Sequence, residues 1–337
     1  MPRTAHTRTH PAALAATLAL ALALPACVMA EAGGVEGTFA RTLTVEGSPN
    51  IEVMTGSGSV EVRSGPEGRI EITGRIRAND GWMNNSSLSA AERVRRLEQN
   101  PPIQQAGQLI RIGHIEDRQL REGVSISYTL VVPASSRLDS RSGSGSQSVQ
   151  GLNGPVSVES GSGSVHLARI GNEVRASTGS GSIEADGIAG AFHGITGSGS
   201  IEARGIKGAI SAKTGSGGID VTQTGSGDVE ASSGSGPVRL HGVRGGVRAN
   251  TGSGGIDVQG APTSEWRLSA SSGSISIALP PGQGFELDAT TGSGHIDVES
   301  PITVSGTVDR RRLRGTVGSG GPLLHVRTSS GGVQIRQ

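Results

Sequence analysis

The strongest constraint in this sequence is a short phrase that returns at a nearly fixed interval. Thr-Gly-Ser-Gly-Ser-Ile-Glu-Ala begins at Thr178 and again at Thr196, and glycine- and serine-rich variants of it continue to the end of the chain. The leading glycines are separated by 18 residues at first and by 18 to 21 residues later. These glycines are Gly143, Gly161, Gly179, Gly197, Gly215, Gly234, Gly252, Gly273 and Gly292.

Apolar residues keep the same register as the glycines. Each phrase is followed by an alternating segment such as Ile201-Glu202-Ala203, which is typical of a half-buried β-strand. Two columns result, Ile183, Ile201, Ile219, Val238, Ile256, Ile275 and Ile296, and two residues later Ala185, Ala203, Val221, Leu240, Val258, Ile277 and Val298. Such a repeat predicts an all-β, parallel β-solenoid with coils of about 18 residues. We expect a right-handed winding, and a β-sandwich is the alternative.

The corners of the coils explain the Gly-Ser runs in this interpretation. Glycine tolerates a positive φ without steric cost, and stacked serine or threonine hydroxyls can hydrogen-bond where like charges would repel. We therefore interpret the recurring glycines as structural turns. The core is expected to be narrow, because the chain has only three Phe, two Trp and one Tyr.

Composition excludes several classes of protein. The 55 glycines do not follow the every-third-residue pattern of collagen, and the regular apolar columns argue against a disordered linker. Lys and Arg together number 30 and Asp and Glu 29, so the whole chain has no basic field for nucleic acid. A membrane is expected as a partner only through an N-terminal lipid anchor.

The N-terminus has the pattern of a secretory signal peptide, which we assign to residues 1–30. Arg3 and Arg8 precede an apolar run over residues 12–24 that is short for a membrane span. Two cleavage sites fit: after Ala30, or before Cys27, the only cysteine, which would then be lipidated. Both alternatives place the mature protein outside the cytoplasm, in the periplasm or at the outer membrane or cell surface.

The remaining chain, residues 36–337, is predicted to be a single solenoid domain with regular repeats over 142–299. A helical insertion is expected at about 79–105, because Ser89-Ala90-Ala91-Glu92 forms a capping box and Pro101-Pro102 ends the helix.

No catalytic, cofactor-binding or metal-binding residue is predicted. The phosphate-binding loop and the Gly-x-Ser-x-Gly elbow of serine hydrolases are absent from the sequence, and its histidines lack metal-binding spacing. Outward acids such as Glu184 and Glu202 would stack about 5 Å apart, which any solenoid produces and which is therefore no sign of a glycosidase.

Three segments resemble a bacterial family of "putative adhesin" domains of unknown function, related to head GIN-domain auto-transporter adhesins. These segments are Ser127–Pro133, Ile277–Pro280 and a C-terminal stretch over 313–331. The resemblance, which spans about residue 36 to the end, implies an exported β-solenoid of the cell envelope without catalytic residues to transfer. The family often has Asp after Thr-Gly-Ser-Gly, a place that only Asp228 keeps here.

The function expected from these observations is that of a non-enzymatic envelope scaffold or adhesin-like binding protein, with an envelope protein or a glycan as partner. The alternative is a lyase or hydrolase of polysaccharides on the same scaffold. An enzyme would require the non-repeat segments 77–123 and 300–315 to converge on one groove, whereas a scaffold would leave regular faces.

Overall fold

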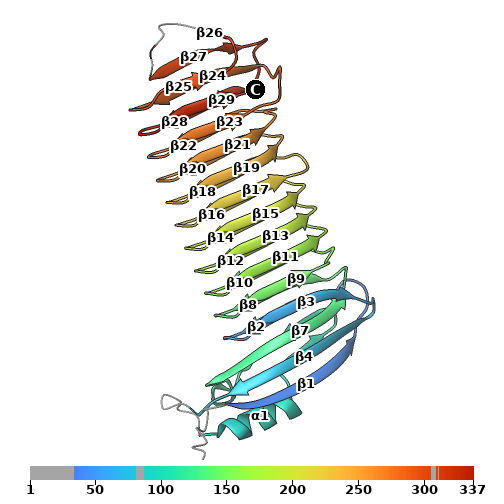
Figure 1. The fold of residues 1–337 in the computed structure, drawn as a ribbon. Helices are drawn as coiled ribbons and strands as arrows, with labels where there is room; N and C mark the ends of the chain where they lie inside the picture. Colours follow the sequence, from blue (N-terminus) through green and yellow to red (C-terminus); the bar gives the residue numbers. More distant parts are fainter. Residues whose placement is uncertain (1–33, 81–86, 305–308, 310) are drawn as a thin grey trace, which may run out of the picture. The chain divides into compact units, whose positions relative to one another are not determined.

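Each coil of the chain contributes one strand to each of two facing sheets (Figure 1). The computed structural model describes residues 34–80, 87–304, 309 and 311–337. Sheet A contains, in spatial order, β1 (Val35–Thr44), β4 (Arg69–Ala78), β7 (Val124–Pro133), β3 (Val60–Gly65), β9 (Gln147–Gln150), β11 (Val165–Ile170), β13 (Ile183–Ile188), β15 (Ile201–Ile206), β17 (Ile219–Gln223), β19 (Val238–Val243), β21 (Ile256–Gly260), β23 (Ile275–Ala278), β29 (Val333–Arg336) and β25 (Ile296–Val298). Sheet B contains β5 (Ile103–Ala106), β6 (Leu109–Ile112), β2 (Asn50–Thr55), β8 (Arg137–Ser142), β10 (Val156–Ser160), β12 (Val174–Thr178), β14 (Phe192–Thr196), β16 (Ile210–Thr214), β18 (Val229–Ser233), β20 (Val247–Thr251), β22 (Trp266–Ala270), β28 (Leu323–Thr328), β24 (Phe285–Thr291), β27 (Arg312–Val317) and β26 (Ile302–Val304).

The predicted β-solenoid is confirmed by the pairing of these strands. Ile201 of β15 lies in parallel register between Ile183 of β13 and Ile219 of β17, as the apolar columns indicate. Along both sheets every second side chain is buried between the sheets, and the buried residues are mostly Ile, Val, Leu and Ala. The alternating pattern in the sequence therefore separates a thin apolar core from two polar outer faces.

A column of hydroxyl groups joins most of the coils at the corner that follows the sheet-B strand. The Thr196 hydroxyl donates to the Gly181 carbonyl of the preceding coil (2.8 Å) and accepts from the Gly199 N–H of its own corner (3.1 Å). The same pair of bonds is made by Ser142, Ser160, Thr178, Thr214, Ser233, Thr251 and Thr291. Each coil thereby satisfies a buried donor and a buried acceptor that its own strand cannot reach.

Close approach of the backbone, rather than a positive φ, explains the corner glycines. The expectation of positive φ is wrong for them, because the positive φ angles lie at other glycines, such as Gly187 and Gly205. A Cβ on Gly197 would collide with the Gly179 carbonyl oxygen below it, and the same collision recurs along the column. Gly273 is the second glycine of its corner and not the first. A Cβ on it would collide with the carbonyl oxygen of Gly254, the second glycine of the neighbouring corner.

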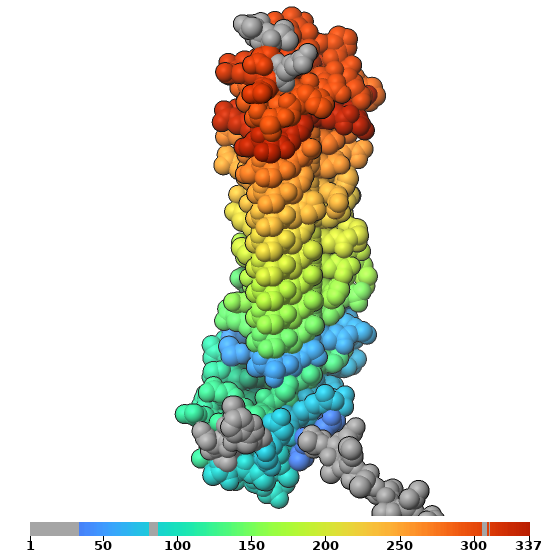
Figure 2. Space-filling view, turned by 60° about the vertical axis from the view of Figure 1, so that its left-hand side comes forward, coloured from blue at the N-terminus to red at the C-terminus, as the bar shows by residue number. Residues whose placement is uncertain are grey.

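The coils follow chain order in the middle of the stack but not at its ends. Spacing alone places Ile296 next to Ile275; instead Val333 of β29 lies between them and pairs with both. The final coil, β28–β29, is thus inserted between the coils β22–β23 and β24–β25, visible as the dark red band between orange bands in Figure 2. At the other end, β2–β3 lies between β6–β7 and β8–β9 in the same way.

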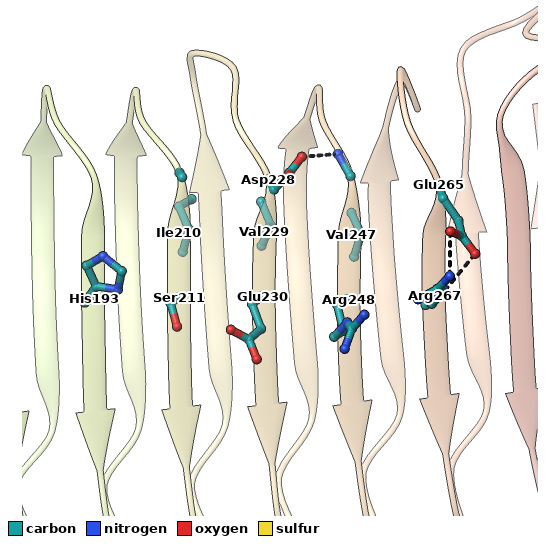
Figure 3. Close-up of a pocket in the computed structure, with 12 residues that line it drawn as sticks. His193, Ile210, Ser211, Asp228, Val229, Glu230, Val247, Arg248, Glu265 and Arg267 are labelled. Atoms are coloured by element: carbon teal, nitrogen blue, oxygen red, sulfur yellow. Dashed lines mark hydrogen bonds and ion pairs between the residues drawn. The ribbon is translucent and has the colours of Figure 1, made fainter.

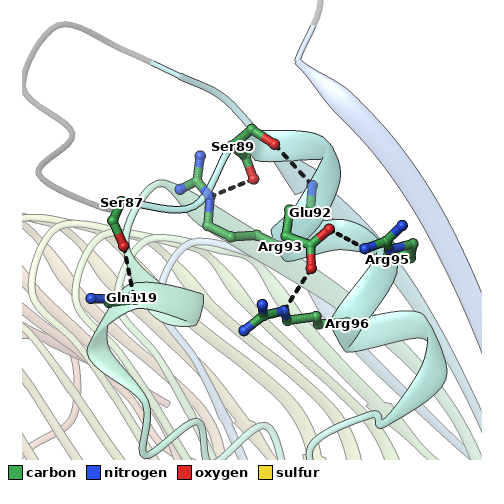
Figure 4. Close-up of polar contacts among 7 residues, drawn as sticks. All are labelled: Ser87, Ser89, Glu92, Arg93, Arg95, Arg96 and Gln119. Atoms are coloured by element: carbon green, nitrogen blue, oxygen red, sulfur yellow. Dashed lines mark hydrogen bonds and ion pairs between the residues drawn. The ribbon is translucent and has the colours of Figure 1, made fainter.

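The non-repeat segment after β4 contains two helices, α1 (Ala90–Gln99) and α2 (Arg118–Arg121). Ser89 caps α1 by accepting from the Glu92 N–H (3.2 Å), whereas the Glu92 carboxylate pairs with Arg95 and Arg96 (Figure 4). Val94 and Leu97 are buried, and α1 packs on β1 and β4. Among the described residues, no helix has the length and apolar composition needed to span a membrane.

Arg93 attaches α1 to its surroundings from a fully buried position. Its guanidinium donates to the carbonyl oxygens of Asn79 (3.0 Å) and Glu122, and pairs with Asp80 (2.6 Å). A buried cation is tolerated because fixed acceptors replace its water shell.

Candidate functional site

The outer face of sheet B is hollowed into a groove of about 470 Å³ that crosses β14 to β22. The parallel register lays one outward side chain from each strand beside the next, so that the groove runs along the stack rather than along a strand (Figure 3). The floor column consists of His193, Ser211, Glu230, Arg248 and Arg267. The rim column, two positions earlier in each coil, consists of Ala209, Asp228, Gly246 and Glu265.

The acidic side chains of the groove all have partners. Asp228 accepts from the Gly246 N–H (2.8 Å), and Glu265 accepts two hydrogen bonds from Arg267 (2.7 and 2.8 Å). Glu230 pairs with Lys213 at 3.1 Å. These contacts fix the acids in place while leaving further oxygen lone pairs free to accept.

Arg248 differs from the other arginines of this column. In β22 and β12 the arginine pairs with a glutamate two residues earlier, as Arg175 does with Glu173 at 2.7 Å. That hydrogen bond is the main cause that holds the pKa of Glu173 below its usual value. The corresponding position before Arg248 is Gly246, and no carboxylate of the described residues pairs with Arg248.

Asp228 lies in this groove and not at the glycine corner. Its phrase, Thr224-Gly225-Ser226-Gly227, connects β17 to β18, at the opposite turn of the coil from the glycine column. The prediction that Asp228 keeps the family's corner aspartate is therefore wrong. The sequence alone assigned Asp228 to the wrong turn, because the same Thr-Gly-Ser-Gly phrase occurs at both turns of this coil.

The other expected site residues lie away from the groove. The corner glycines line the turn from sheet B to sheet A, and Cys27 lies outside the described residues. The stacked acids Glu184 and Glu202 of sheet A each have a partner, namely His166 at 2.9 Å and Arg204. Within the described ranges no three His, Cys, Asp or Glu side chains are grouped so that they could hold a metal ion.

A second hollow, of about 300 Å³, lies on sheet B over β2, β6 and β8. It is lined by Met54 and by two ion pairs, Arg111 with Glu52 and Arg141 with Asp139. Its charges are mutually compensated, so the groove with Arg248 is the better candidate for binding.

Sequence reasoning did not identify Arg248, Glu230 or Glu265. A signal was present, because Glu173-Val-Arg175 and Glu265-Trp-Arg267 share a spacing that Gly246-Val-Arg248 breaks. The missing glutamate can be interpreted only when it is known that the residue two positions before the arginine lies on the same face of the sheet, where it could form an ion pair.

Comparisons with known proteins agree with the sequence landmarks. No curated protein matches the chain. A crystal structure described as a "putative adhesin" from Bacteroides fragilis aligns with 13% identity and a TM-score of 0.30, covering 89% of this chain and 97% of that one. A "putative cell adhesion protein" from Clostridium sporogenes aligns with 10% identity and a TM-score of 0.20, covering 89% and 100%. A family model described as Toastrack DUF4097 matches residues 120–336, and the chain therefore belongs to the Toastrack DUF4097 family.

Proposed function

We propose that this chain is a non-enzymatic, exported scaffold or adhesin-like binding protein of the cell envelope. The observation that carries the proposal is the separation of the two non-repeat segments. The segment after β4 supplies β5 and β6 at one edge of sheet B, and β26 and β27 lie at the opposite edge. The described parts of these segments thus lie at opposite edges of the sheet, and the groove in the middle is lined by repeat residues.

The chemistry of the groove also favours binding over catalysis. Its acids are held in place by Lys213, by Arg267 and by a backbone N–H, as suits groups that contact a bound partner. Their outward, fixed positions suit recognition of a partner that lies along the stack.

Export is tested by fractionating cells that express the full-length chain or its Cys27→Ala variant. We expect both proteins outside the cytoplasm, in the periplasm or at the cell surface, and protease treatment of intact cells distinguishes these two locations. Loss of membrane association in Cys27→Ala would identify the lipid anchor, and unchanged behaviour would favour cleavage after Ala30. Retention of the wild-type chain in the cytoplasm would contradict the proposal.

The absence of catalysis is tested separately with the purified chain. Incubation with a panel of acidic and neutral polysaccharides should release no reducing ends and no unsaturated uronate. Release of either product, lost in a Glu230→Gln variant, would favour the alternative of a polysaccharide-active enzyme.

A further inference from the structure

We propose that the groove over β14 to β22 binds an acidic glycan in which carboxylates are separated by neutral sugars, and that Arg248 holds one such carboxylate. The inference rests on the proposed function and assigns its ligand class. It starts from the one guanidinium in the floor column that has no carboxylate partner among the described residues.

Arg248 lacks the partner on its own strand that Arg175 and Arg267 of the same column have. Arg175 and Arg267 use the glutamate two residues earlier, but Arg248 has Gly246 at that position, and the Asp228 carboxylate that lies against Gly246 is bonded to its backbone N–H. Arg248 lies in register between Glu230 and Arg267, and each of these neighbours is already paired with another residue, Lys213 and Glu265 respectively. A carboxylate that approaches from the solvent side would accept a forked pair of hydrogen bonds from the Arg248 guanidinium.

The acidic side chains around Arg248 limit the charge density of a ligand that the groove can bind. Asp228, Glu230 and Glu265 would repel a densely charged chain such as a nucleic acid or a highly sulfated glycan. The same oxygens can accept hydrogen bonds from sugar hydroxyls, and Ser211 and His193 add further polar contacts. The arrangement therefore fits a mostly neutral, hydroxyl-rich chain with isolated carboxylates.

The direction of the groove favours a glycan over an extended peptide. Floor side chains recur from strand to strand, at about 4.8 Å. Same-face side chains of an extended peptide recur at about 6.6 to 6.8 Å and would lose register within two coils. An extended chain of pyranose rings has a repeat close to the strand spacing and can present one sugar to each coil.

The test measures binding of hyaluronan hexasaccharide to the purified full-length chain by calorimetry. Hyaluronan is the probe because a carboxylate occurs on every second sugar. Arg248→Gln removes the proposed anchor. Gly246→Glu keeps Arg248 but supplies an internal partner, with the Asp228 side chain shifting slightly to make room for the new Cβ. Arg175→Gln is the matched control, since Arg175 occupies the same column outside the groove and is already paired.

We expect Arg248→Gln and Gly246→Glu each to weaken binding at least about tenfold, the cost of one charge-assisted contact, and Arg175→Gln to change it by less than about twofold. Thermal unfolding of each variant verifies that it is folded. Equal binding by wild type and Arg248→Gln would overturn the inference, as would tighter binding of heparin hexasaccharide or oligo(dT). Failure of the wild-type chain to bind hyaluronan would also overturn the inference. If the fractionation still finds the chain outside the cytoplasm, the proposed function stands.

Discussion

At the scale of single residues, a steric contact between glycines and a pair of hydroxyl hydrogen bonds shape the corner of a coil. Recurrence indicated that Gly197 and its equivalents are turns, and that stacked hydroxyls could bond from coil to coil. The steric reason was hidden, because the collision of a Cβ on Gly197 with Gly179 depends on how closely two coils approach. Arg93 was missed for a similar reason, since its buried acceptors come from distant segments.

The hydroxyl column has a gap that provides a direct test. Ala270 occupies the place of Thr251 and Thr328 in the neighbouring coils, so neither of the two column bonds is made by its side chain. We expect Ala270→Thr to raise the free energy of unfolding by about 1 kcal/mol, because it supplies an acceptor to Gly273 and a donor to Gly254. Urea unfolding measures this.

Ala270→Val is the control for the prediction at Ala270. Valine has nearly the same shape as threonine but no hydroxyl, and it should not reproduce the gain. Equal stabilisation by threonine and valine would mean that packing, and not the hydroxyl column, determines stability at this corner.

At the scale of elements, the central strands were predictable because each one repeats the same inward and outward alternation. The capped helix α1 was predictable from Ser89 and the two prolines that follow it. The antiparallel pairing of β4, β24 and β27 could not be predicted, because these strands lie outside the regular repeat that defines the register of the other strands. The groove likewise follows from register, which brings together residues 18 or 19 positions apart.

Charging the core should unfold the stack from its middle. Ile201 is buried between the two sheets, so Ile201→Asp would place an unpaired carboxylate in an apolar environment. We expect a loss of more than about 4 kcal/mol, whereas the outward Glu202→Lys should cost less than about 1 kcal/mol. Thermal melts compare the two variants, and equal melting temperatures would contradict the assignment of faces.

The antiparallel pair β24–β27 should make stability depend on pH through Asp288. A hydrogen bond from Arg314 (2.7 Å) holds the pKa of Asp288 below its usual value, and the positive charge of Arg314 adds to the effect. The stabilisation is complete above the ordinary Asp pKa of about 3.9 and is lost as the pH falls through the lower pKa of the folded state. Asp288→Asn should therefore lower the melting temperature at neutral pH, and the difference from wild type should shrink in acid.

Asp220→Asn serves as the control for Asp288, because Asp220 faces outward from β17 and forms no ion pair with other described residues. Its effect on the melting temperature should be small at both pH values. A difference between wild type and Asp288→Asn that stays constant into strong acid would show that the ion pair does not contribute.

At the scale of the whole molecule, the sequence predicted a stack of coils but the wrong order at its C-terminal end. Every coil carries the same apolar columns, so Val333 and Ile296 are equally good neighbours for Ile275 by sequence alone. In the structure β28 pairs with both β22 and β24 and so separates them. The repeat thus predicts the strands and corners of a single coil better than it predicts the order of the coils in the stack.

Cysteine cross-linking tests this order, and with it the in-register stacking, most directly. In a Cys27→Ala background, Arg267→Cys combined with His325→Cys places two thiols on directly paired residues of adjacent strands. Neighbouring strands lie about 4.8 Å apart, within the Cα range of a disulfide, whereas strands two coils apart do not. We predict rapid oxidative cross-linking of this pair and none between Arg267→Cys and Asp288→Cys. Cross-linking of the second pair in preference to the first would contradict the account.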